Sequence, residues 1–210
     1  MKHIYTLTAS ITVFSCALIR INGYNNPMEK LPRGFVRKTN WYVITGGPGS
    51  GKTTTIDLLR EHGYTVTIEH ARHYIDTMKT TGATVEEIRS NRQAFQSGVL
   101  KMQLEQEQAL SPDDTVFLDR AIPDALAYYQ FLGLPEDAII MDAIANASYK
   151  KIFILDPLPL VNDYARTETA EDQKKIHGLI ADVYVSLGFP IVTVPVLPPK
   201  ERVEFILERL

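Results

Sequence analysis

One glycine-rich segment constrains the fold of this chain more than any other. It follows the apolar run 41–45 and reads Gly46-Gly47-Pro48-Gly49-Ser50-Gly51-Lys52-Thr53. The spacing is G-x-x-x-x-G-K-[ST], in which the glycines allow left-handed turns, so that backbone N–H groups converge on phosphate oxygens. An amphipathic segment, 53–61, comes next, and the N-terminus of such a helix favours an anion. Strand, loop and helix in this order indicate a nucleotide-binding α/β domain.

The side chains of this loop fit the same chemistry. Lys52 adds a charge that can reach the β- and γ-phosphates, and the Thr53 hydroxyl suits a Mg²⁺ ligand position. We therefore predict that the nucleotide contacts Gly46, Gly47, Pro48, Gly49, Ser50, Gly51, Lys52, Thr53 and Thr54.

Short apolar runs alternate with helix-length segments from residue 41 onward. This alternation is typical of βαβ units and predicts a three-layer α/β fold with a five-stranded parallel sheet. The expected strands are 42–45, 65–68, 115–118, 151–155 and 191–194. The expected helices are 53–61, 71–79, 85–110, 123–132, 135–146, 170–187 and 200–209.

Two charged residues close the third expected strand. Asp119 follows the run 115–118 and is itself followed by Arg120. An acid at the end of the strand beside the phosphate loop can hold Mg²⁺, although Asp119 could instead cap the next helix. Arg120 occupies the position at which a motor ATPase carries a glutamate. Its planar guanidinium can donate two parallel hydrogen bonds to a second phosphate or to an acidic substrate. These residues favour phosphoryl transfer over mechanical work.

A second carboxylate closes the second expected strand. Glu69 could accept a proton from an acceptor hydroxyl while Arg72 orients that acceptor. The alternative is an ion pair between Glu69 and Arg72 at the surface. His70 and His73 lie three residues apart without a third ligand, so we expect no metal there. We expect His62 and His177 at the surface.

The segment 156–170 leaves the carboxyl end of the fourth expected strand, where ligands of parallel sheets bind. We predict that it forms a lid. Arg166 on this lid could stabilise charge on the transferred phosphoryl group, or pair with Glu168 instead.

We divide the chain into an N-terminal extension, 1–38, and one P-loop domain, 39–210. The apolar run 4–21 leaves three interpretations open: a start at Met28 or a loosely attached leader, a membrane-attached segment, or a secretion signal. We favour the first and expect a cytoplasmic protein, in which membrane contact involves only residues 1–27. A net charge of −3 provides no basic field for nucleic acid.

Four segments together resemble a small AAA-type P-loop family that includes the ribosylnicotinamide kinase domain of NadR and the TRPL translocation defect protein. The resemblance covers about four-fifths of the chain and rests on residues 43–54, 69–72, 117–124 and 194–198. It implies a nucleotide-kinase-like fold with Mg²⁺ and ATP, or GTP as the alternative, at Lys52 and Thr53. It further implies that Asp119 supports the metal and that Arg166 belongs to the lid.

The leading hypothesis is a phosphotransferase of the nucleoside or nucleotide kinase type that moves a γ-phosphoryl group to a small acceptor. The predicted catalytic residues are Lys52, Glu69, Asp119 and Arg166, and the predicted acceptor-binding residues are Arg72 and Arg120. The alternative is a regulatory ATPase that binds a partner and signals by loop ordering.

Overall fold

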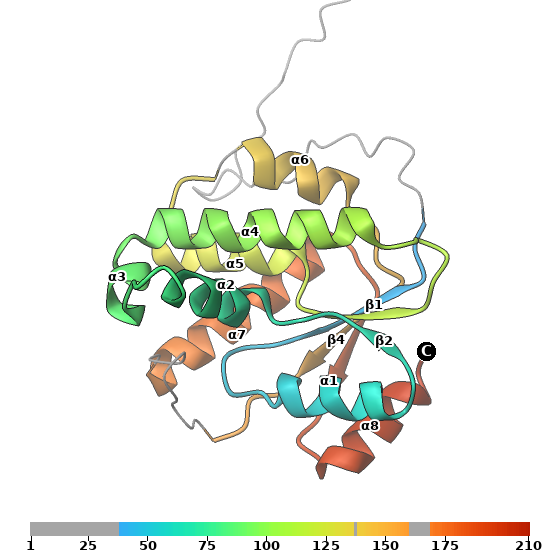
Figure 1. Ribbon diagram of the computed structural model, residues 1–210. Coiled ribbons are helices and arrows are strands. Elements are labelled where there is room, and N and C mark those ends of the chain that lie inside the picture. Colours follow the sequence, from blue (N-terminus) through green and yellow to red (C-terminus); the bar gives the residue numbers. More distant parts are fainter. Residues whose placement is uncertain (1–37, 137, 160–168) are drawn as a thin grey trace, which may run out of the picture. The chain divides into compact units, whose positions relative to one another are not determined.

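A parallel sheet of five strands lies between two layers of helices (Figure 1). The computed structural model describes residues 38–136, 138–159 and 169–210. The strand order is β2-β3-β1-β4-β5, and every pairing is parallel. The strands are β1 (Trp41–Thr45), β2 (Thr65–Val66), β3 (Val116–Asp119), β4 (Lys151–Leu155) and β5 (Ile191–Val194). The predicted five-stranded parallel sheet is confirmed.

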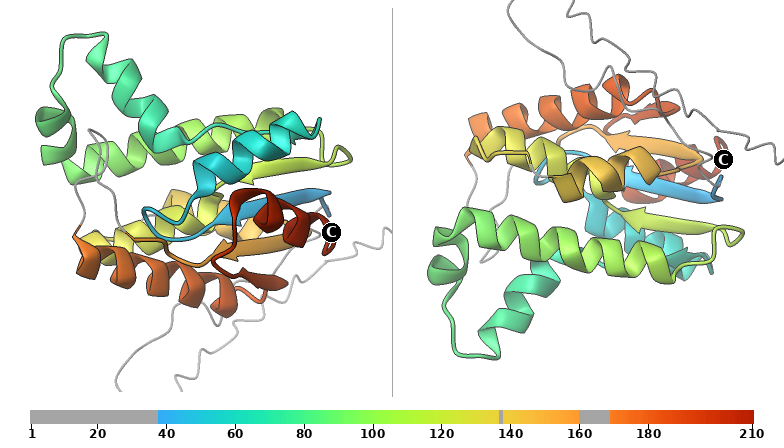
Figure 2. Two further views of the ribbon diagram at one scale, coloured as in Figure 1. Left: turned by 90° about the horizontal axis from the view of Figure 1, so that it is seen from below. Right: turned by 90° about the horizontal axis from the view of Figure 1, so that it is seen from above.

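Each face of the sheet has its own helices (Figure 2). One face is covered by α1 (Lys52–Glu61) and α8 (Pro199–Leu207). The other is covered by α4 (Arg92–Ala109), α5 (Ile122–Leu132) and α7 (Ala170–Ser186), with α6 (Ala138–Asn146) packed against α5. Two further helices, α2 (His70–Lys79) and α3 (Val85–Ser90), pack against α4. None of the described helices is both long and apolar enough to cross a membrane.

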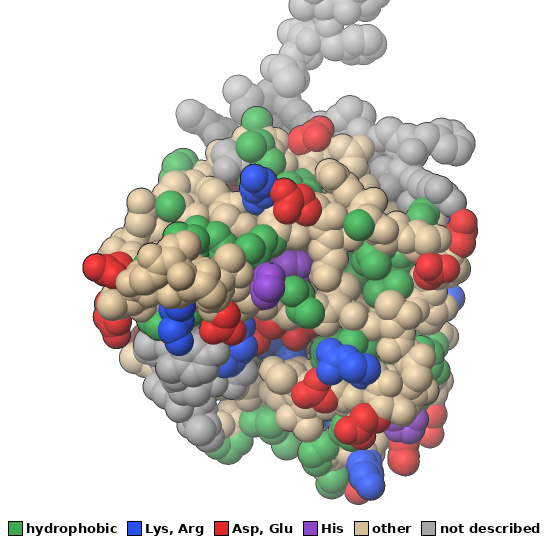
Figure 3. Space-filling model, in the orientation of Figure 1, with side chains coloured by type: hydrophobic (Ala, Val, Ile, Leu, Met, Phe, Trp, Pro, Cys, Tyr) green, Lys and Arg blue, Asp and Glu red, His purple; other side chains and the backbone are tan. Residues whose placement is uncertain are grey.

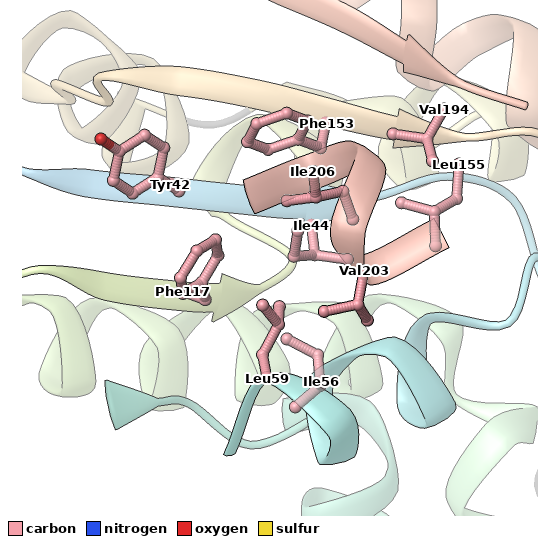
Figure 4. Packing of buried hydrophobic residues seen from close by; sticks show 10 residues of the cluster. All are labelled: Tyr42, Ile44, Ile56, Leu59, Phe117, Phe153, Leu155, Val194, Val203 and Ile206. Atoms are coloured by element: carbon pink, nitrogen blue, oxygen red, sulfur yellow. The ribbon is translucent and has the colours of Figure 1, made fainter. Parts of the chain in front are cut away.

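Buried apolar side chains join the sheet to α1 and α8 (Figure 4). Alternate residues of β1 point to this face, because successive side chains of a strand lie on opposite sides. The Tyr42 ring stacks on Phe117 of β3 with ring centroids 5.3 Å apart. The cluster consists of Tyr42, Ile44, Ile56, Leu59, Phe117, Phe153, Leu155, Val194, Val203 and Ile206. It fixes α1 under β1 and therefore fixes the loop that joins them.

The strand register brings the carboxyl ends of the strands together. Ile44 pairs with Asp119, Thr45 pairs with Ile154, and Leu155 pairs with Val194. The loop that follows β1 and the residues that follow β3 and β4 consequently meet at one edge of the sheet.

The expectation of one helix over 85–110 is wrong, because the chain breaks at Asn91. Asn91 has φ −89° and ψ 77°, and its side-chain oxygen accepts a hydrogen bond from the Ala94 N–H at 3.1 Å. It therefore ends α3 and caps α4. Thr84 and Glu87 form a capping box that starts α3.

The helices α2, α3 and α4 share a small apolar cluster of their own. Its buried members are Ile75, Ile88 and Phe95, and the Tyr74 ring meets Phe95 edge-on at 5.6 Å. These three helices thus form a separately packed unit, which we call the α2–α4 cap.

Candidate functional site

The loop 46–51 takes the tight path that its glycines predict. Gly46 has φ 135°, and a Cβ at this position would lie 2.6 Å from the Leu155 carbonyl oxygen of β4. Gly51 has φ 82° and starts α1. Both positions exclude L side chains, the first by contact and the second by backbone conformation. Thr53 and Thr54 follow in the first turn of α1, and both are exposed.

Lys52 lies folded over this loop. Its Nζ donates hydrogen bonds to the carbonyl oxygens of Gly46 (3.1 Å) and Gly47 (2.9 Å) and to the Ser50 hydroxyl (3.2 Å). Burial, with Arg120 nearby, lowers the pKa of Lys52 to about 7. The lysine is thus held at the loop by carbonyl and hydroxyl dipoles, and a polyphosphate would add anionic charge that raises this pKa again.

Two helices support the loop from outside. The Gly47 N–H donates to His177 Nδ1 at 3.3 Å, and the Gln173 amide donates to the Pro48 carbonyl oxygen at 2.7 Å, both from α7. Arg202 of α8 donates from Nη1 to the Ser50 carbonyl oxygen at 2.7 Å. The expectation that His177 lies at the surface is therefore wrong. Sequence reasoning missed all three supports, because only the fold brings these distant residues to the loop.

Asp119 ends β3 directly beside the loop. Its backbone N–H donates to the Thr67 hydroxyl at 2.8 Å, and its side chain is 3% exposed. Burial, with Glu69 nearby, raises the pKa of Asp119 to about 6. Its Oδ1 is buried and has no hydrogen-bond partner among the described residues. Asp119 does not cap α5, whose N-cap is Ala121, so the alternative of a helix cap is wrong.

Arg120 is the only described residue other than glycine with a positive φ, 68°. Its guanidinium donates to the Gly46 carbonyl oxygen at 3.2 Å, to Asp124 Oδ1 at 3.0 Å and to the Tyr128 hydroxyl at 3.4 Å. The guanidinium also lies over the Tyr128 ring, 5.4 Å from its centroid. Arg120 therefore ties the loop to α5 while its side chain lines the cavity described below.

Asp124 is a buried connection that sequence reasoning missed. Besides Arg120, it accepts hydrogen bonds from the Thr45 hydroxyl, from the Ala121 N–H at 3.1 Å and from the Tyr184 hydroxyl at 2.6 Å. It thus joins β1, α5 and α7 behind the loop. The only sequence signal for it is its position, five residues after the acid that closes β3.

Glu69 and Arg72 lie at the start of α2. The second strand ends at Val66 instead of residue 68, because Ile68 turns outward and is 44% exposed, so Glu69 is the N-cap residue of α2 and not a strand end. The Glu69 carboxylate pairs with Arg72 Nε at 3.5 Å, and both side chains are half-buried. The ion pair that the sequence left as an alternative is therefore present, and both residues still line the cavity.

A cavity of about 430 Å³ opens between the loop and the α2–α4 cap. Lys52, Asp119 and Arg120 line it at the strand ends, and Phe95 and Gln96 line it from α4. Acidic and basic side chains gather at the surface just below α2 (Figure 3). Lys52 directly follows the loop 46–51, and Asp119 lies beside that loop; both also line this cavity. A ligand in the cavity would therefore lie next to a phosphate bound by the loop.

The structure describes only part of the expected lid and of the N-terminal extension. Arg166 and most of the expected lid, 160–168, lie outside the described residues, as does the N-terminal extension up to residue 37. The described start of this segment contacts the loop, because the Leu158 N–H donates to the Gly49 carbonyl oxygen at 3.3 Å. Within the described residues no group of three or more His, Cys, Asp or Glu side chains could hold a metal ion. A Mg²⁺ ion would therefore need phosphate and water ligands besides Asp119 and Thr53.

Solved structures with this fold include enzymes that handle nucleotides. NadR in complex with NAD and AMP-PNP superposes with a TM-score of 0.62 at 18% identity, over 81% of this chain and 49% of that one. The thymidylate kinase of Ehrlichia chaffeensis superposes with a TM-score of 0.55 at 14% identity, over 82% and 99%. The deoxyadenosine kinase of M. mycoides with bound dATP gives 0.52 at 16% identity, over 80% and 98%.

These likenesses establish the fold. The chain spans about half the length of the NadR chains that it matches, 43% and 49%. No functionally curated protein matches the sequence at a significant level. The predicted nucleotide-kinase-like architecture is confirmed by the strand order β2-β3-β1-β4-β5 of this chain together with these superpositions.

The sequence itself identifies the family. The sequence profile of the AAA domain matches residues 41–202, which include the phosphate loop, the Asp119-Arg120 pair, α7 and the first turn of α8. A match of this extent covers more than half of the chain. The protein belongs to the AAA domain family of nucleotide-binding P-loop proteins.

Proposed function

We propose that this protein is a Mg²⁺-dependent phosphotransferase of the nucleoside or nucleotide kinase type. The observation that carries the proposal is the cavity of about 430 Å³ that adjoins the phosphate loop. An ATPase that transfers its phosphoryl group only to water needs no second organic site, whereas a kinase needs an acceptor next to the γ-phosphate. Lys52 and Asp119 border both compartments, where transfer between two bound ligands would take place.

The donor nucleotide lies on the loop, with Lys52 moving from the loop carbonyls to the β- and γ-phosphates. The acceptor hydroxyl attacks the γ-phosphorus, the bond from phosphorus to the β–γ bridging oxygen breaks, and that oxygen leaves with ADP. The hydroxyl proton passes to Glu69, which lies in the cavity wall beside Arg72. Asp119 and Thr53 would hold Mg²⁺, which would neutralise charge on the phosphates. The buried, unpartnered Oδ1 of Asp119 fits this role.

An acceptor screen tests the proposal. ATP consumption by the full-length protein with Mg²⁺ is measured with and without nucleosides, nucleotides and nicotinamide riboside, and Lys52→Ala serves as the blank. We expect one acceptor to raise turnover at least tenfold and to become phosphorylated. We expect Glu69→Gln to abolish this gain, while Glu61→Gln, at the exposed end of α1, keeps it.

The alternative of a nucleotide switch makes a different prediction for the same assay. A switch would hydrolyse ATP slowly with every acceptor, and Glu69→Gln would leave that rate unchanged, whereas Lys52→Ala would abolish nucleotide binding. The contacts of Lys52 with the loop carbonyls are compatible with loop ordering by a nucleotide, which is the structural basis of this alternative.

A further inference from the structure

Two buried nitrogen atoms of side chains in the cavity wall have no hydrogen-bond partner among the described residues. They are Nε2 of His70, the first residue of α2, and Nε2 of Gln103 in α4. Both side chains line the cavity, and they are only 6% and 3% exposed. A buried polar atom without a hydrogen bond lowers stability, so two such atoms in one cavity wall indicate a polar ligand.

The His70 side chain is uncharged at neutral pH. Burial, with His73 nearby, lowers the pKa of His70 to about 4, so the imidazole carries one proton at pH 7. The ring also interacts with the side chain of Gln106, which belongs to the helix that carries Gln103. Because Nε2 has no partner among the described residues, this nitrogen remains for a ligand.

The amide of Gln103 provides the second atom. Gln103 also interacts with Glu107, four residues further along α4, yet its amide nitrogen has no partner among the described residues. Gln106, which interacts with His70, follows Gln103 by three residues, and helical residues at this spacing share a face. The two unpartnered nitrogens therefore belong to the same part of the cavity wall.

Apolar side chains line the cavity from the same two helices. They are Ile75 of α2 and Phe95 and Val99 of α4. A charged group in such surroundings is unfavourable unless an opposite charge pairs with it, and neither His70 nor Gln103 carries a charge. The ligand group that meets these two side chains is therefore uncharged.

The two nitrogens also define the hydrogen-bonding pattern of that group. The amide nitrogen of Gln103 donates, and Nε2 of a neutral imidazole accepts in one of its two tautomers. A carboxamide offers an acceptor and a donor side by side. The edge of a heterocyclic base with an amino group beside a ring nitrogen offers the same pair, so either group would satisfy both side chains.

We propose that the acceptor is recognised through an uncharged edge with one hydrogen-bond donor and one acceptor, a carboxamide or the edge of a heterocyclic base, which His70 and Gln103 bind through their Nε2 atoms. The inference rests on the proposed function, because it names the group by which the acceptor site selects its substrate. The cavity of about 430 Å³ lies within the range of sites for small organic ligands.

Matched ligand pairs test the recognition of this edge. The full-length protein is saturated with AMP-PNP and Mg²⁺ to fill the phosphate loop, and binding is measured by calorimetry. Two pairs test a base: adenosine against purine riboside, and cytidine against pyrimidin-2-one riboside, where the second member lacks the amino group. Nicotinamide riboside against nicotinate riboside tests a carboxamide. We expect the member with the complete edge to bind about tenfold more tightly in at least one pair, because its analogue leaves a buried polar atom unpaired.

Gln103→Met and His70→Leu identify the residues responsible. We expect each variant to reduce the ratio of the two affinities within the preferred pair about tenfold, because the complete edge then loses one of its partners. A general loss of folded protein would leave this ratio unchanged. The controls make the same substitutions at exposed positions of the same helices that do not line the cavity, Gln108→Met and His73→Leu. A melting curve for each variant verifies folding, and Gln103→Met decides alone if His70→Leu does not fold.

The outcomes separate this inference from the proposed function. Equal affinities within all three pairs, no binding of any probe, or the same ratio in Gln103→Met and Gln108→Met would each overturn the inference. Phosphorylation of an acceptor at a rate that neither Gln103→Met nor His70→Leu changes would also overturn it and would support the kinase. A preference for the complete edge that depends on Gln103, without phosphoryl transfer from ATP, would support the inference and overturn the kinase.

Discussion

Replacing Glu107 by Gln should stabilise the protein in alkaline solution and change its pH dependence. Glu107 of α4 is buried, and its carboxylate accepts a hydrogen bond from the Tyr149 hydroxyl at 2.9 Å. Burial raises the pKa of Glu107 from 4.5 to about 8. The folded state therefore binds this proton at pH values where the unfolded chain has released it. Since the folded state then holds more protons, the free energy of unfolding falls as the pH rises from 4.5 to 8.

The size of the effect follows from the shift. Each unit of pKa difference corresponds to about 1.4 kcal/mol, so the change between pH 5 and pH 9 has an upper limit of about 4 kcal/mol. Gln keeps the shape of the side chain and an oxygen that accepts from Tyr149, but it carries no titrating proton. The variant should therefore lose this part of the pH dependence and gain most over the wild type above pH 8.

Urea unfolding at pH 5, 7 and 9 measures the difference between variant and wild type, so that all other titrating groups cancel. Glu105→Gln is the control, because Glu105 is an exposed acid on the same helix. A difference for Glu107→Gln that stays constant within about 0.5 kcal/mol across this range would refute the reasoning.

Three further changes act on the phosphate loop. Gly46→Ala should lower the free energy of unfolding by at least about 2 kcal/mol, because the new Cβ would lie 2.6 Å from the Leu155 carbonyl oxygen; urea unfolding measures the loss. Arg202→Gln should weaken ATP binding about tenfold in calorimetry, since it removes the hydrogen bond to the Ser50 carbonyl that holds the loop. Asp119→Asn should raise the melting temperature of the ligand-free protein at pH 8, because burial raises the pKa of this carboxyl to about 6 and its ionisation above that pH costs stability. The same variant should abolish Mg²⁺-dependent turnover.

Each of these three predictions would be contradicted by one specific result. Normal stability of Gly46→Ala would mean that the loop and β4 can separate freely. Unchanged ATP affinity in Arg202→Gln, relative to the exposed Arg60→Gln, would remove the role of α8 in holding the loop. Equal melting temperatures of Asp119→Asn and wild type at pH 8 would show that the buried carboxylate carries no net cost.

The features predictable from the sequence are those with a local cause. Gly46, Gly51 and Lys52 adopt their conformations because of residues within one short segment, so their pattern alone indicates the loop. The parallel sheet follows from the alternation of apolar runs and helix-length segments. Asp119 was found because its position at the end of a strand is visible in the chain.

The features that escaped prediction depend on contacts between distant parts of the chain. The packing of α7 and α8 brings three side chains to the loop: Gln173, His177 and Arg202. Asn91 interrupts the long expected helix because its side chain caps the following segment, and such a residue also occurs inside helices without ending them. The pairing of Glu107 with Tyr149 spans 42 residues and leaves no local signature.

The separate packing of the α2–α4 cap has a consequence for how proteins of this kind can diversify. The cap is held by Ile75, Ile88 and Phe95, none of which belongs to the core beneath the phosphate loop. Substitutions in the cap can therefore alter its shape and charge without weakening the core that positions Lys52. Gene duplication followed by change in this one region would generate differently shaped cavities beside an unchanged phosphate loop.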